Sequence, residues 1–149
     1  MPSDTHQLDR EGNSHQFRGI YTWKFGDRHV FSPSVWLLYE DLDGNAMKNV
    51  TIDFQPTYGY IGDKFDIVVN GVIGFADYDD KNPIYGETNK DVRYGLGALG
   101  FWKNPFGWKP FGLEKFRFYG TAGYFNSDAD INFYDTTILQ VAAGVWVGF

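Results

Sequence analysis

Apolar and polar residues alternate along extended stretches of this chain. From Asn49 to Tyr60, the apolar set is Val50, Ile52, Phe54, Pro56, Tyr58 and Tyr60, and the residues between are Asn49, Thr51, Asp53, Gln55, Thr57 and Gly59. A period of two places these sets on opposite faces of a β-strand, whereas a helix would mix them. The same pattern recurs from Phe65 to Phe75 and from Leu139 to Phe149. It predicts amphipathic strands.

Weaker alternation extends the prediction to roughly seven strands of about ten residues, the length that a tilted membrane strand requires. The expected strands cover 17–25, 31–39, 49–60, 65–75, 92–102, 116–124 and 139–149. Pro33 and Pro56 lack a backbone N–H, so irregular pairing is expected beside them. The predicted fold is all-β, an antiparallel up-and-down transmembrane β-barrel of about eight strands, or the C-terminal part of a larger barrel.

The connections between the strands alternate in length. Three longer, acidic connections, DLDGNAMK, DYDDKNPIYGETNK and NSDADINFYD, fall at one end of the predicted sheet, which counting back from Phe149 makes the outer end. The stretch NPFGWKPFGLEK is the one long connection at the other end. The expected organisation is a polar segment, 1–16, without the apolar core of a signal peptide, followed by the barrel, 17–149. Without that core, an exported chain is expected to be in its mature form.

An odd strand count conflicts with the even number of bacterial single-chain barrels. An eighth strand near Thr5 to Asp9, a misplaced strand boundary and a fragment of a larger barrel all remain open. We expect closure within the chain through a poorly patterned extra strand, because an unpaired edge in hydrocarbon leaves backbone groups unsatisfied.

Composition agrees with a β-rich envelope protein. Aromatic residues make up 19% of the chain, with 18 Gly, and no run of about 18 apolar residues exists to form a membrane helix. The net charge of −6 argues against nucleic-acid binding. The absence of Cys excludes disulfides and thiol chemistry. The mean hydropathy of −0.37 is compatible with membrane strands, whose apolar residues occupy every second position.

The terminal sequence AAGVWVGF resembles the C-terminal signal by which outer-membrane barrels engage the barrel assembly machinery, with Gly144, Val147 and Phe149 at matching positions and Ala142 where a polar residue is usual. The segments NPIYGET, NPFGW and SDADINFYD resemble the C-terminal hairpins of surface-lipoprotein assembly modifiers and related outer-membrane families of unknown function. The resemblance covers Asn82 to Phe149. It implies an outer-membrane barrel but not lipoprotein export, because the periplasmic helical domain of those proteins is missing.

Alternation also predicts which charges face the barrel interior. The inward set is Arg18, Lys24, Glu40, Asp53, Asp66, Arg93 and Arg117. Enclosed charges are tolerable only when they are paired or hydrated, so we expect a lumen charge network in which Asp53 and Asp66 each contact an arginine. A structural network is favoured over a selectivity filter. Five apolar residues, Phe54, Ile67, Val69, Val141 and Val145, are expected to face lipid.

Catalytic and metal sites are not expected. His6 and His15 lie in the polar N-terminal segment, and His29 would share a strand face with Phe31 rather than with Ser32 or Ser34. The acidic residues Asp77, Asp79, Asp80, Glu87, Asp128 and Asp130 lack the spacing of a calcium loop. They are expected to be solvated and to face lipopolysaccharide.

The sequence thus indicates a non-enzymatic, integral protein of the bacterial outer membrane with a structural, surface-exposed or small-pore role and no cofactor. Its expected partners are outer-membrane lipid, lipopolysaccharide and, during biogenesis, the barrel assembly machinery. A soluble lipocalin-like barrel around an apolar ligand and an outer-membrane lipid-modifying enzyme remain alternatives.

Overall fold

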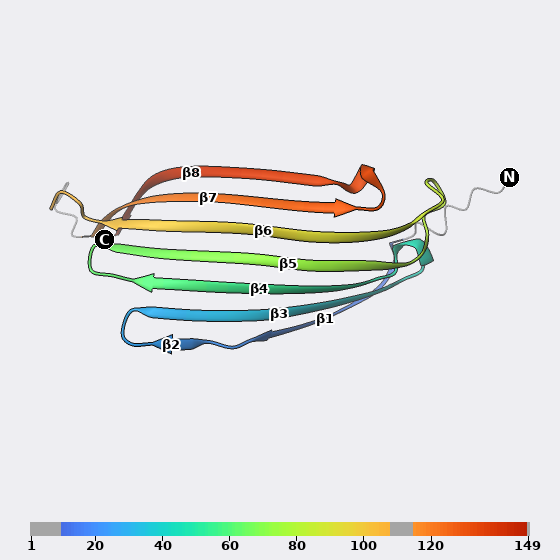
Figure 1. Ribbon diagram of the computed structural model, residues 1–149, viewed down its shortest axis with the longest axis horizontal. Helices are drawn as coiled ribbons and strands as arrows, with labels where there is room; N and C mark the ends of the chain where they lie inside the picture. Colours follow the sequence, from blue (N-terminus) through green and yellow to red (C-terminus); the bar gives the residue numbers. More distant parts are fainter. Residues whose placement is uncertain (1–9, 108–114, 149) are drawn as a thin grey trace.

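The computed structural model describes residues 10–107 and 115–148 and consists of one antiparallel, up-and-down β-sheet (Figure 1). Its strands are β1 (Gly12–Ile20), β2 (Trp23–Phe25), β3 (His29–Leu42), β4 (Asn49–Ile61), β5 (Phe65–Lys81), β6 (Thr88–Lys103), β7 (Lys115–Ala129) and β8 (Thr136–Gly148). Two short 3-10 turns, η2 (Asn45–Met47) and η4 (Asn132–Tyr134), lie in the connections. The all-β, up-and-down prediction is therefore confirmed. No helix among these residues is long and apolar enough to span a membrane.

The first two strands are one strand interrupted at Tyr21 and Thr22. Both β1 and β2 pair with β3 in one continuous register. Tyr21 lies opposite Pro33 and donates its N–H to the Pro33 carbonyl (3.1 Å), but Pro33 has no N–H to return. The β4–β5 ladder likewise skips Gln55 and Pro56 without a change of register. The irregular pairing expected at the two prolines is confirmed.

The strands begin earlier and run longer than the alternation predicts. β5 has 17 residues and β6 has 16, against about ten expected. β1 begins at Gly12, earlier than the start at residue 17 that the alternation predicts for the first strand. The difference arises because the strand ends are polar on both faces and carry no alternation signal, while the ladder hydrogen bonds continue there.

The sheet is open. The strand order runs from β1 through β3 to β8, and within the described residues β8 pairs only with β7 and β1 only with β3. Within the described residues, the first and last strands therefore do not pair with each other. The physical reason is direction: across an odd number of antiparallel positions, β1 and β8 point the same way, so direct closure would require a parallel seam. The suggested extra strand near Thr5 to Asp9 lies outside the described residues.

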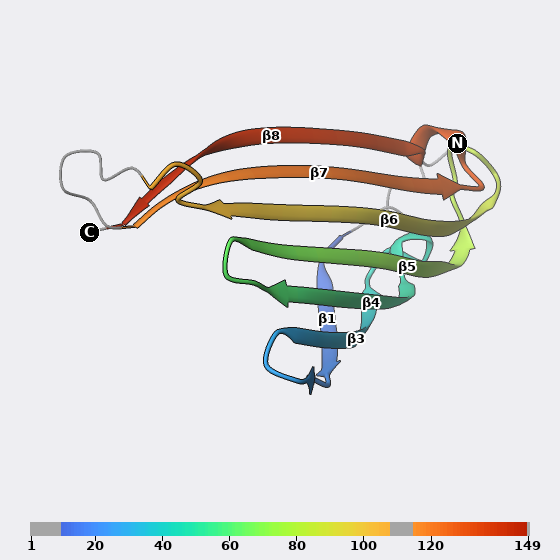
Figure 2. The ribbon, with the colours of Figure 1, turned by 60° about the vertical axis from the view of Figure 1, so that its left-hand side comes forward.

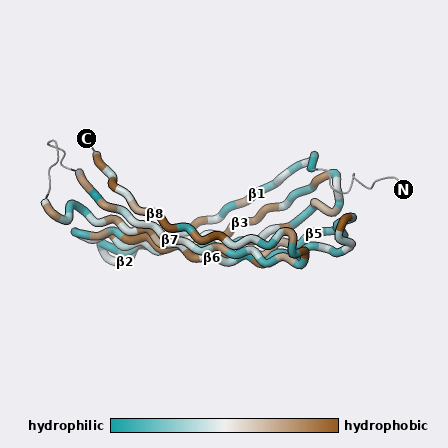
Figure 3. The backbone as a smooth tube through the Cα atoms, turned by 90° about the horizontal axis from the view of Figure 1, so that it is seen from above, coloured by the Kyte–Doolittle hydropathy of each residue, from teal (hydrophilic) through white to brown (hydrophobic). Residues whose placement is uncertain are grey.

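The sheet twists and curves into a trough (Figures 2 and 3). The short connections β2–β3 and β4–β5 lie at one end, the turn end. The connections β3–β4, β5–β6 and β7–β8 lie at the other, the loop end (Figure 1). All three acidic segments therefore gather at the loop end, as the alternation of connection lengths predicts.

Candidate functional site

The two faces of the trough differ in chemistry. Seven residues at or below 8% exposure share one face, and they are Ser34, Asn49, Thr51, Asp53, Ala76, Ser127 and Ala129. Side chains converge on the inside of a curved sheet, so this crowded face is the concave one. The cross-strand register also places every predicted inward charge on this face, namely Arg18, Lys24, Glu40, Asp53, Asp66, Arg93 and Arg117.

Asp53 and Arg93 form an ion pair across the middle of the concave face. Asp53 on β4 and Arg93 on β6 both lie opposite Gly74 on β5. Arg93 Nη2 donates to Asp53 Oδ1 at 3.0 Å, with side-chain exposures of 23% and 6%. A Cβ at Gly74 would overlap the Asp53 carboxylate. The bond thus crosses two strand spacings because the intervening strand carries glycine there.

Asp66 is the centre of a second charge group near the turn end. Its Oδ1 lies 2.6 Å from Lys103 Nζ and its Oδ2 3.8 Å from Arg117 Nη1. Lys103 Nζ also donates to the Gly62 carbonyl (2.8 Å), and the Arg117 guanidinium lies 5.3 Å from the centre of the Trp146 ring. Both aspartates therefore contact an arginine, as expected from the sequence.

Two predicted network members make different contacts. Glu40 accepts a hydrogen bond from Asn49 Nδ2 (2.6 Å) rather than pairing with a cation. Arg18 is exposed and forms no ion pair with another described residue. Conversely, Asp91 was missed: it accepts from Ser127 Oγ (2.5 Å), and its other oxygen lies 4.0 Å from Arg93 Nε. Asp91 and Lys103 sit near the ends of β6, where alternation is faint, although the parity of β6 places both inward.

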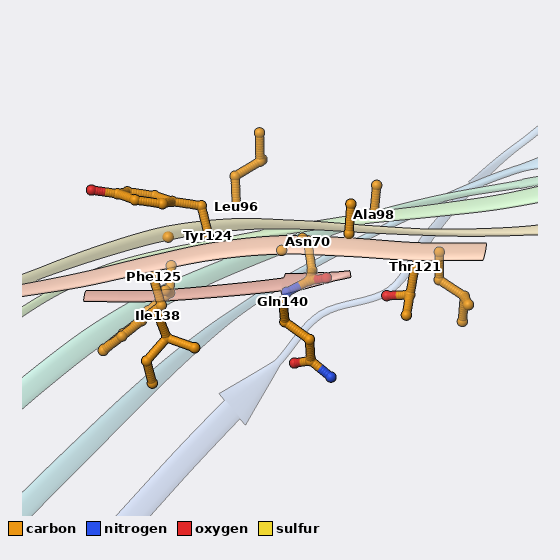
Figure 4. A pocket seen from close by; sticks show the side chains of 14 residues that line it. Asn70, Leu96, Ala98, Thr121, Tyr124, Phe125, Ile138 and Gln140 are labelled. Carbon is orange, nitrogen blue, oxygen red and sulfur yellow. The ribbon is translucent and has the colours of Figure 1, made fainter. Parts of the chain in front are cut away.

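Uncharged polar side chains line the concave face between the two charge groups. A cavity of about 320 Å³ beside the Asp53–Arg93 pair is lined by Gln55, Thr57 and Asn70. Gln140 and Thr121 continue this surface across β7 and β8, and they project to the opposite side of the sheet from Leu96 and Tyr124 (Figure 4). The trough thus offers hydrogen-bonding groups along its length.

The convex face is apolar and exposed. Phe54, Ile67, Val141 and Val145 lie on it with exposures from 43% to 75%, and Val69 lies on it opposite Tyr58. These five residues were the ones expected to face outward, and the register places all of them away from the trough. The apolar surface extends across all strand positions from Phe17 to Leu139.

Two rows of aromatic residues bracket this apolar band. The loop-end belt consists of Tyr39, Phe75, Tyr94 and Tyr124. The turn-end belt consists of Trp23, Phe25, Phe31, Tyr58, Tyr60, Phe65, Trp102, Phe116 and Phe118. Several neighbours in the turn-end belt are in ring contact, including Phe65 with Trp102 (5.7 Å) and Phe116 with Phe118 (5.1 Å).

Both belts run obliquely to the strands and in the same direction. In the loop-end belt, the register sets Tyr39 of β3 level with Asp77 of β5, and Tyr124 of β7 level with Gly71. In the turn-end belt, Phe31 and Phe118 are level with Val69 and Phe65. Each belt thus shifts along the strand direction as it crosses the sheet. At about 3.3 Å per residue and about 4.8 Å between strands, the shift corresponds to an angle of roughly 35–45° between the belt and the direction perpendicular to the strands.

The histidines make aromatic contacts on the convex face. His29 Nδ1 lies 2.6 Å from the Tyr58 hydroxyl, and the His15 ring stacks on Tyr39 (6.5 Å). Ser34 lies on the concave face, where its hydroxyl donates to the Gln55 carbonyl (3.3 Å). His29 and Ser34 are therefore separated by the sheet. His6 lies outside the described residues.

The acidic loops form local ion pairs. Lys48 Nζ lies 3.0 Å from Asp41, and Lys90 Nζ lies 3.7 Å from Asp77. The pKa of Lys48 is raised, first by its hydrogen bond to the Asp41 carboxylate and then by the charge of that group. Residues 10–107 and 115–148 contain no group of three or more side chains arranged to hold a metal ion.

Two residues of the C-terminal motif lie in β8. Gly144 is opposite Tyr119, and a Cβ there would come within 2.6 Å of the Tyr119 hydroxyl, so glycine provides the space for this ring. Val147 is on the convex face, 38% exposed, and Phe149 lies outside the described residues. Gly144 thus has a packing role whatever its part in assembly.

Comparison with known proteins identifies a family for this chain. The family model "Protein of unknown function (DUF2860)" matches residues 2–146. No curated protein and no solved structure matches the chain.

Proposed function

The chain belongs to the DUF2860 family, and we propose that it forms part of the wall of an outer-membrane β-barrel, with lipid on its convex face and water in its trough. The observation that carries the proposal is the pair of parallel aromatic belts. Transmembrane barrels have aromatic girdles at both membrane interfaces, and their strands tilt by about 35–45° to the membrane normal. Belts that follow flat interfaces must cross tilted strands obliquely, as these two do.

The spacing of the belts fits a bilayer. Tyr94 and Trp102 are eight residues apart on β6, and Phe75 and Phe65 are ten apart on β5. These separations are about 26 and 33 Å along the strand, or about 18–23 Å along the membrane normal after a tilt of about 45°. An outer-membrane apolar band is about 25 Å tall. The remaining strand length extends beyond the membrane at the loop end, where the acidic segments lie.

The concave face suits an aqueous lumen. Two charge contacts, Asp53–Arg93 and Asp66–Lys103, lie on it, and amide and hydroxyl side chains line the cavity beside the first of them. A lipocalin-like protein would need the opposite arrangement, with apolar residues around an interior cavity. The charge contacts in the trough and the exposed apolar residues on the convex face therefore favour a structural and small-pore role over apolar-ligand storage. A non-catalytic role is favoured because the sheet separates His29 from Ser34.

Completing such a wall needs strands beyond residues 10–107 and 115–148. Hydrocarbon does not tolerate the unpaired edges of β1 and β8. Because these strands point the same way, an odd number of additional strands closes an antiparallel barrel with an even total. A second copy inserted in the same orientation would again present parallel edges, so it does not supply the antiparallel seam.

Tryptophan quenching tests the membrane assignment directly. The protein is refolded into phosphatidylcholine vesicles as two single-tryptophan variants, one retaining Trp102 on the convex face and one retaining Trp36 on the concave face, with Phe at the other tryptophans. Lipids brominated along the acyl chain are expected to quench Trp102 strongly and Trp36 weakly. Equal quenching of the two, or a folded monomer in plain buffer without detergent, would refute the proposal.

A further inference from the structure

A separate cavity lies at the loop end of the trough, beyond the Asp53–Arg93 pair. Its volume is about 270 Å³, and it forms where η2, the end of β5, the start of β6 and η4 meet. Its polar lining is Tyr78, Asp80, Asn82, Asn89, Asp91 and Tyr134, with Arg10 beside them. Three acidic connections therefore contribute to one concave, mostly polar site.

Two buried asparagines give the cavity a fixed wall and an open donor. Asn82, 3% exposed, accepts from Ile84 N–H (3.0 Å) and donates to the Tyr134 hydroxyl (3.3 Å). Asn89, 7% exposed, accepts from Ile131 N–H (3.2 Å) through Oδ1. Its amide nitrogen forms no hydrogen bond with another described residue. This nitrogen is accessible to solvent, because it is not among the fully enclosed polar atoms without a partner, and it can therefore donate to a ligand or to water.

The charges of the cavity are nearly balanced. Asp91 is held by Ser127 and lies beside Arg93, while Asp80 accepts from the N–H of Lys81 (2.7 Å). The Arg10 guanidinium supplies a further positive charge. An ionic ligand would leave one set of charges uncompensated, so the lining favours a neutral ligand that both donates and accepts hydrogen bonds.

Exposed aromatic rings adjoin the cavity. Tyr134 belongs both to its wall and to a cluster with Tyr85 and Phe133. Tyr85 and Phe133 stack at 6.1 Å and are 42% and 75% exposed. The site thus combines a polar cavity with a solvent-facing apolar platform. A pyranose ring has matching properties, with hydroxyls around its edge and C–H groups on its faces.

We propose that the loop-end cavity binds a ring of a neutral saccharide. Its hydroxyls accept from the Asn89 amide and donate to Asp80, and an adjoining ring of the same glycan lies on Tyr85 and Phe133. This site goes beyond the barrel-wall role and depends only on the arrangement of the loops. Its failure would therefore leave the membrane assignment intact.

Saturation-transfer NMR of the full chain tests the proposal. The chain is refolded in a zwitterionic detergent, because glycoside detergents would compete for the site. The probes are the methyl glycosides of glucose, galactose, mannose and N-acetylglucosamine, with glucosamine and glucuronate as charged comparators. At least one neutral glycoside is expected to bind saturably, with a Kd on the order of millimolar for so small a ligand.

Asn89→Asp is the diagnostic variant, because it keeps the acceptor for Ile131 but removes the open amide donor. We expect affinity to fall at least tenfold, whereas the matched change Asn13→Asp, on the convex face of β1, leaves it unchanged. Tyr134→Phe serves as a second variant if Asn89→Asp does not fold, and a threefold or greater loss is expected. The proposal is overturned if no neutral glycoside binds, if a charged comparator binds more tightly, or if the folded cavity variants bind like the parent.

Discussion

The Asp53–Arg93 pair allows a quantitative test of how the trough is stabilised. Replacing Arg93 by Met removes the charge but keeps an extended chain, and it leaves the Asp53 carboxylate enclosed at 6% side-chain exposure. Breaking a fully buried ion pair by removing one partner costs about 3–5 kcal/mol. Arg93 is 23% exposed, so water compensates part of that loss and we expect about 2–3 kcal/mol. Replacing both residues, as Asp53→Asn with Arg93→Met, removes the unpaired charge and is expected to cost less than Arg93→Met alone.

The assay is equilibrium urea unfolding in phospholipid vesicles, followed by tryptophan fluorescence for the parent, both single variants and the double variant. The double-mutant cycle is expected to give a coupling energy of at least about 1.5 kcal/mol, because the two groups are in direct contact. A loss below about 0.5 kcal/mol for Arg93→Met, or strict additivity, would contradict the reasoning. Either result would mean that water already satisfies both charges.

Three further predictions follow from other contacts. Gly74→Ala is expected to destabilise the protein by about 1–3 kcal/mol in the same urea assay, because its Cβ would overlap the Asp53 carboxylate; Gly120→Ala, with no atom within 4 Å of its Cβ, is the control expected to change little. Val141→Arg, on the convex face, is expected to lower unfolding stability in vesicles by about 2–4 kcal/mol, and Gln140→Arg, on the concave face, by less than about 1 kcal/mol; similar losses would contradict the assignment of faces. Lys48→Met is expected to lower the thermal midpoint equally at pH 6 and pH 9. The pKa of Lys48 is raised in the folded protein, so the contribution of its charge to folding stability is complete below the ordinary value of 10.5 and declines only as pH rises through the higher folded value. If the difference in thermal midpoint between parent and variant disappears between pH 6 and pH 9, the Lys48–Asp41 contact is refuted.

The aromatic belts could not be predicted from the composition of the chain. A high content of Phe, Tyr and Trp is visible in the sequence, but a belt is a property of the register. Tyr39 and Tyr124 belong to one row only because four successive ladders bring β3 and β7 into a defined stagger. The strand tilt that supports the membrane assignment could therefore be derived only from the register of the folded sheet.

The same limit applies to the cavity at the loop end. Asn89, Asp91 and Tyr134 come from the start of β6 and the connection before β8, and nothing in their spacing indicates a common site. Sequence alternation assigned the acidic segments to one end of the sheet. It did not bring their asparagines and tyrosines together, because loop conformation has no period.

The sequence by itself determined where most strands lie and which residues share each face, because a period of two is a local property of each strand. It therefore assigned Phe54 and Val141 to the apolar face, and Asp53, Asp66, Arg93 and Arg117 to the polar face. Only the tertiary structure decided which charges meet, since the partner of Asp53 depends on two registers and on the absence of a side chain at Gly74. It also decided that the sheet is open across residues 10–107 and 115–148. The sequence already predicted an odd number of strand positions, but whether the edges of β1 and β8 are paired depends on the whole sheet.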